Sequence, residues 1–121
     1  MSEAPLLLVV DDDPSVLLLV DVLAEKMGFR VKAVSSGLQA LEHLRDGLHP
    51  HVILLDIMME RIDGLTFMNH LREMPRLEAT PVVAMSTPAV LDRYGDQLQV
   101  SGTLLKPITQ ATLSQALQRY R

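Results

Sequence analysis

The sequence VILLDIMMERIDG, from Val52 to Gly64, places four consecutive apolar residues directly before an aspartate. A short apolar run rich in branched side chains indicates a strand buried on both faces. Because an unpaired charge is costly to bury, we expect Asp56 at the exit of that strand. Apolar residues at helical spacing follow Asp63-Gly64. In open α/β sheets ligands bind outside the carboxyl ends of the strands, so Asp56 is a candidate functional residue.

The alternation of strand and helix recurs along the chain. Further apolar or alternating runs predict strands at residues 6–10, 29–34, 81–85 and 102–105, with 29–34 as an edge or half-exposed strand. Asp13-Pro14, Ser35-Ser36 and Thr109 are typical of helix starts. A short helix is predicted over residues 89–94, ending at Gly95. This order, β-α five times over, predicts one domain over residues 1–121, with a parallel sheet covered by helices on both faces.

The composition narrows the class of protein. A chain of 121 residues with 48% hydrophobic residues can bury a real core as one domain. The net charge of −4 argues against a dedicated nucleic-acid surface. Without cysteine the chain has no thiol nucleophile and no thiolate metal site. Its apolar runs are far shorter than the ~20 residues that span a bilayer, and its N-terminus does not resemble a signal peptide. We therefore expect a cytoplasmic domain that neither spans a membrane nor binds nucleic acid directly.

Chemically active side chains follow the predicted strands. They are Asp11-Asp12-Asp13, Asp56, Ser86-Thr87 and Lys106-Pro107. Carboxylates that converge on one rim of a parallel sheet repel one another, and a hard divalent cation relieves that repulsion. Mg²⁺ suits a site with few carboxylates that also binds phosphate. With a lysine ammonium and a serine hydroxyl beside them, these groups predict a phosphoryl pocket that contains a carboxylate nucleophile.

Each of these residues also has a simpler interpretation. The acidic run could be a helix N-cap cluster, which explains Asp13 well and Asp11 poorly. Taken alone, Asp56 would be a loop acid, Ser86 a turn residue and Lys106 a solvated lysine. The coincidence of all four at equivalent strand ends favours the functional interpretation.

Four segments together resemble the response-regulator receiver domain of two-component signalling, the CheY-like family. They are LVVDDDP (Leu8 to Pro14), VILLDIMM…DGL (Val52 to Leu65), PVVAMS (Pro81 to Ser86) and LLKP (Leu104 to Pro107). The resemblance extends from Leu6 to Tyr120. It implies a doubly wound, flavodoxin-like sheet of five parallel strands in the order 2-1-3-4-5.

The resemblance also implies a role for each matching residue. Asp56 corresponds to the phosphoacceptor, Ser86 to the switch hydroxyl and Lys106 to the lysine that pairs with the phosphate. Asp11 and Asp12 correspond to the acidic pair that holds Mg²⁺ together with Asp56, with Asp12 preferred as the direct ligand. Met58 corresponds to the position whose backbone carbonyl completes the metal site. A cis peptide bond is expected between Lys106 and Pro107.

The family is one of signalling switches, so no independent substrate turnover is expected beyond assistance to the domain's own phosphorylation and dephosphorylation. The implied donor is a phosphohistidine on a sensor histidine kinase or a phosphotransfer protein. An output domain or a partner protein would receive the signal, and the resemblance also allows a weak homodimer.

Three positions depart from the family pattern. Glu60 replaces the usual proline, Thr87 replaces a smaller residue, and Thr103 replaces the usual aromatic residue. Because Thr103 is too small for the usual aromatic switch, we expect phosphorylation to act on residues 87–102 more than on residue 103 and the last helix.

Two other functions stay open at this point. A Mg²⁺-dependent aspartyl phosphatase of the haloacid dehalogenase type would use a similar nucleophile. It normally carries a second Asp at the position of Met58, and it needs a cap and a longer chain. A phosphate-independent pseudo-receiver would dock a partner, although the complete set of acidic, hydroxyl and lysine residues argues against it.

Overall fold

The computed structural model describes residues 4–59 and 62–121, and the backbone alone for residues 94–96. In this part of the chain five parallel strands form one sheet in the order β2-β1-β3-β4-β5, as predicted. The strands are β1 (Leu6–Val10), β2 (Arg30–Val34), β3 (Val52–Asp56), β4 (Val82–Ser86) and β5 (Gly102–Leu105). The half-exposed run at 29–34 is the edge strand β2, also as predicted.

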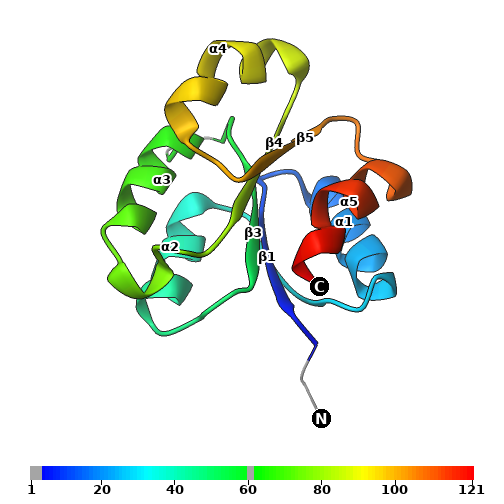
Figure 1. Cartoon of the computed structure of the whole chain (residues 1–121), viewed down its shortest axis with the longest axis horizontal. Helices are drawn as coiled ribbons and strands as arrows, with labels where there is room; N and C mark the ends of the chain where they lie inside the picture. Colours follow the sequence, from blue (N-terminus) through cyan, green and yellow to red (C-terminus); the bar gives the residue numbers. More distant parts are fainter. Residues whose placement is uncertain (1–3, 60–61) are drawn as a thin grey trace.

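Helices cover both faces of the sheet. They are α1 (Pro14–Lys26), α2 (Gly37–Arg45), α3 (Gly64–Arg72), α4 (Pro88–Leu98) and α5 (Gln110–Leu117), with 3₁₀ turns η1 (Pro75–Leu77) and η2 (Gln118–Tyr120). Figure 1 shows α1 and α5 on one side of the sheet and α2, α3 and α4 on the other. Among the described residues, none of these helices is long and apolar enough to cross a bilayer.

The core consists of two apolar clusters, one on each face of the sheet. Alternate residues of β3 divide between them: Ile53 and Leu55 join the cluster under α2 and α3, whereas Val52 and Leu54 join the cluster under α1 and α5. Every residue of β3 is buried. The central strand is therefore buried on both faces, as its sequence predicts, and it holds Asp56 at its carboxyl end.

The helix starts that precede α1, α2 and α5 are confirmed. The carboxylate of Asp13 accepts the N–H of Ser15 at 2.9 Å, with Pro14 as the first helical residue. The hydroxyl of Ser36 caps α2, and that of Thr109 forms a reciprocal capping box at α5. Each such cap contributes about 1 kcal/mol of stability.

The prediction for the fourth helix is wrong in its extent. α4 does not stop at Gly95 but continues to Leu98 and ends at Gln99, whose φ of 52° is left-handed. A glycine within a helix costs about 1 kcal/mol relative to alanine. Burial of Leu98, and packing of Val90 and Leu91 against the core, offset that cost. Glu60, one of the three departures, lies outside the described residues.

Candidate functional site

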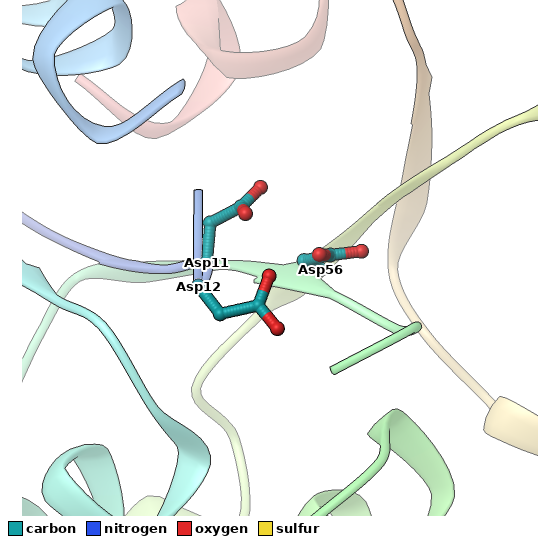
Figure 2. A group of neighbouring side chains, drawn as sticks. All are labelled: Asp11, Asp12 and Asp56. Carbon is teal, nitrogen blue, oxygen red and sulfur yellow. The ribbon is translucent and has the colours of Figure 1, made fainter. Parts of the chain in front are cut away.

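Strand register brings three carboxylates together at one rim. β1 and β3 are neighbours, with Val10 opposite Leu55, so the next residues, Asp11 and Asp56, leave the sheet side by side. Oxygen atoms of Asp11, Asp12 and Asp56 all lie within 4.8 Å of one another. Figure 2 shows the three side chains grouped where the two strands end.

Asp11 is completely buried, and both of its oxygens have partners. Its Oδ1 accepts the backbone N–H of Asp13 at 2.9 Å, and its Oδ2 accepts a hydrogen bond from Lys106 Nζ at 3.0 Å. Its own N–H donates to the carbonyl of Val34, which extends the β1–β2 ladder. Asp11 is thus fixed by the strand ends and forms the base of the site, whereas Asp12 is exposed at its edge.

Asp56 is only 4% exposed and lies between a donor and a cation. Its Oδ1 accepts the N–H of Met58 at 3.1 Å, and its Oδ2 lies 3.5 Å from Lys106 Nζ. Burial, and to a smaller extent the charges of Asp11 and Asp12, raise the pKa of Asp56 to about 6, against the lowering effects of the Met58 N–H and Lys106. The carboxylate is therefore mostly ionised at neutral pH, as a nucleophile must be.

Lys106 approaches the carboxylates from the end of β5. Its backbone N–H donates to the carbonyl of Ser86 at 2.9 Å, and the Lys106–Pro107 peptide bond is cis, as predicted. Burial lowers the pKa of Lys106, but the Asp11 hydrogen bond and the charges of Asp56 and Asp11 outweigh that effect and raise it overall. The ammonium therefore stays charged beside the acids.

Ser86, Thr87 and Thr103 are the other residues that the sequence analysis singled out. Ser86 is the last residue of β4 and is 3% exposed; since Met85 pairs with Asp56, Ser86 lies one residue further along the adjacent strand. Thr87 is the N-cap of α4 but makes no capping bond with its side chain. Thr103 is exposed on β5, so its side chain fills no part of the core.

The donor set fits a hard divalent cation. Three carboxylates supply oxygen ligands, which Mg²⁺ prefers, and Lys106 places its ammonium beside two of them, Asp11 and Asp56. Met58 is 57% exposed, and because its thioether is a soft donor that Mg²⁺ does not favour, what this position can offer such a metal is its backbone carbonyl. A bound Mg²⁺ would supply charge neutralisation for phosphate oxygens.

The comparisons with known proteins agree with this geometry. Residues 7–118 match the sequence profile of the family described as "Response regulator receiver domain". The chain belongs to that family. This receiver domain is thus a signalling module of two-component systems rather than a turnover enzyme.

Relatives and solved structures extend the match. The receiver domain is 33% identical over 114 residues to the signal transduction histidine-protein kinase BarA of Escherichia coli K12, covering 93% of the chain but only 12% of BarA. It matches the chemotaxis protein CheY4 of Vibrio cholerae with a TM-score of 0.86 and 27% identity, over 99% of this chain and all of that one.

A third relative bears on the metal. The receiver domain of the sensor histidine kinase PA1611 from Pseudomonas aeruginosa PAO1 has a TM-score of 0.85 and 25% identity, with 97% of both chains covered. That structure has a magnesium ion coordinated in its active site cleft.

Two contacts in the site are absent from the sequence interpretation. One is the hydrogen bond between Asp11 and Lys106, which are 95 residues apart. The other is the close packing of Gly64 on Ile57, directly after Asp56. The sequence did contain a signal for this second contact, because Gly64 stands at the start of a helix, where no turn requires a glycine.

Proposed function

We propose that this receiver domain, residues 1–121, is a phosphorylation-dependent switch whose phosphoacceptor is Asp56. The observation that carries the proposal is the convergence of Asp11, Asp12, Asp56 and Lys106 at one rim of the sheet. Membership of the receiver family supports it. The donor is a phosphohistidine of a sensor histidine kinase or a phosphotransfer protein, and the reaction depends on Mg²⁺.

In the proposed reaction, a carboxylate oxygen of Asp56 attacks phosphorus. The bond between phosphorus and the donor's imidazole nitrogen breaks, and its electron pair stays on that nitrogen. Lys106 lies 3.5 Å from the accepting carboxylate, so its ammonium can neutralise the transferred oxygens. The Met58 N–H holds the other oxygen of Asp56 and so orients the nucleophile.

The roles of the other residues follow from their positions. Asp12 and Asp11, with Asp56 and the Met58 carbonyl, would hold Mg²⁺. Ser86, on the strand next to β3, would donate its hydroxyl to the phosphate and so report phosphorylation to the fold. The response would be a change of conformation or of binding to an output domain, a partner protein or a second copy of the chain. We propose a cytoplasmic location, where the domain would meet the kinase that donates the phosphoryl group.

Incubation with a small phosphodonor, with and without Mg²⁺, tests the proposal by intact mass. A single phosphoryl adduct that forms only with Mg²⁺ is the expected result. Continuous hydrolysis of the donor without an adduct would indicate an aspartyl phosphatase instead. An unchanged mass under all conditions would indicate a phosphate-independent docking domain.

A further inference from the structure

Gly64, the first residue of α3, lies directly against the backbone of the residue after Asp56. A Cβ added at Gly64 would lie 2.7 Å from Ile57 Cβ, 2.8 Å from its Cγ2 and 2.9 Å from its Cα. The φ of Gly64 is not left-handed, so its backbone conformation does not require glycine. What requires glycine here is the lack of space.

The obstacle cannot be removed by rotating a side chain. Ile57 Cα belongs to the backbone, and Ile57 Cβ is fixed to it, so only a shift of the chain would make room. Ile57 is held on two sides: its N–H donates to Met85 O at 3.3 Å, and its carbonyl accepts the N–H of Gly64 at 3.1 Å. Well-packed interiors transmit such strain rather than absorb it.

That backbone segment joins the candidate metal ligands. Ile57 lies between Asp56 and Met58, whose N–H is bonded to Asp56 Oδ1. A shift of Ile57 would therefore move both the carboxylate and the Met58 peptide. Binding constellations need their groups held within about 0.5 Å of the productive geometry.

We propose that Gly64 is a positioning residue for the Mg²⁺ site: its missing side chain lets α3 close against Ile57 and so fixes Asp56 and the Met58 peptide. This inference rests on the proposed function, since it takes the metal site from there. It assigns Gly64 no contact with metal or phosphate.

The test is a calorimetric Mg²⁺ titration of Gly64→Ala, with amide chemical shifts recorded before metal is added. We expect the affinity to fall roughly tenfold or more, as when groups that support metal ligands are disturbed. Without metal, the amide chemical shifts of Gly64→Ala and of the parent should differ most, among residues near the site, at Ile57 and Met58. Gly102→Ala is the matched control, because a Cβ there meets only Val83 Cγ2, at 3.9 Å, and affinity should not change.

A second variant separates backbone from side-chain effects. Ile57→Ala removes Cγ2 but keeps Cα and Cβ, so the double variant Gly64→Ala/Ile57→Ala should bind Mg²⁺ as weakly as Gly64→Ala. Parental affinity in the double variant would contradict the proposal. Parental affinity in Gly64→Ala would also contradict it. Loss of the folded structure of Gly64→Ala, measured by circular dichroism, would contradict it as well, because Gly64 would then be needed for the fold as a whole rather than for the site. If the parent itself does not bind Mg²⁺, the proposed function fails instead.

Discussion

The ammonium of Lys106 contacts two acids and lies closer to one of them than to the other. It lies 3.0 Å from Asp11 Oδ2 and 3.5 Å from Asp56 Oδ2. The buried Asp11 therefore holds the lysine beside Asp56 without fully neutralising the nucleophile. Asp12 is exposed and adds negative charge at the edge of the same group.

The exposed position of Asp12 leads to a prediction about metal affinity. Disturbing groups that merely support a metal ligand costs ~10–100-fold in affinity, so Asp12→Ala should weaken Mg²⁺ binding at least about tenfold. Removal of one of three mutually repelling carboxylates should also relieve repulsion within the metal-free site. Calorimetric titration measures the affinity.

Asp13→Asn is the matched control for Asp12→Ala. It removes the same charge from the adjacent position while keeping a side-chain oxygen that can cap α1. Its effect on Mg²⁺ affinity should be clearly smaller. If Asp12→Ala binds Mg²⁺ as well as the parent does, Asp12 is not a ligand.

The raised pKa of Asp56 gives a pH-dependent prediction. Because its pKa is raised from 3.8 to about 6 on folding, the folded state binds this proton more tightly than the unfolded state. The contribution of Asp56 to stability is therefore most favourable below pH 3.8 and is lost as the pH rises through 6. In metal-free buffer, Asp56→Asn should raise the free energy of unfolding at pH 7 by on the order of 2–3 kcal/mol.

Urea unfolding with a chelator present, at several pH values between 4 and 7.5, measures this effect. The difference between Asp56→Asn and the parent should shrink as the pH falls. A difference that stays constant over the range would show that the ionisation of Asp56 carries no cost in the fold.

Among the helices, α4 is the one that its own capping and interior residues stabilise least. Its N-cap Thr87 makes no side-chain capping bond, its interior contains Gly95, and it ends at a left-handed Gln99. Each feature costs helix stability. By contrast, α5 begins with a capping box and buries Leu113 and Leu117.

A phosphate mimic bound at Asp56 should therefore act mainly on residues 87–102. Ser86, which precedes this segment, would gain a charge-assisted bond, and a ligand shifts an equilibrium through such differential contacts. Thr103 is exposed and leaves no aromatic side chain to reorient. Amide hydrogen exchange with and without the mimic should change most within residues 87–102. A large change confined to Thr103 and α5 would contradict this prediction.

Over the whole chain, local pattern was enough to predict the parallel sheet. The apolar run of β3 predicted its double burial, and the capping residues predicted the starts of α1, α2 and α5. The extent of α4 was not predictable from Gly95, because burial of Leu98 is a tertiary effect that overrides helix propensity.

The candidate site was also predictable from the sequence only in part. The strand-end rule predicted that Asp11, Asp12 and Asp56 converge, because equivalent ends of parallel strands meet at one rim. It could not predict that Lys106 lies nearer to Asp11 than to Asp56, nor that Gly64 is packed on Ile57. The first depends on side-chain distances between segments 95 residues apart, and the second on how closely α3 approaches the Ile57 backbone.

The central claim is that Asp56 receives the phosphoryl group. Its most direct test is peptide mapping after treatment with a small phosphodonor and Mg²⁺, on the parent, Asp56→Asn and Asp63→Asn. Asp63 is an exposed acid in the same loop, and asparagine can keep its bond to the Thr66 N–H, so Asp63→Asn is the matched control. We predict one phosphoryl group on the peptide that contains Asp56 in the parent and in Asp63→Asn, and none in Asp56→Asn. Equal labelling of Asp56→Asn would contradict the claim.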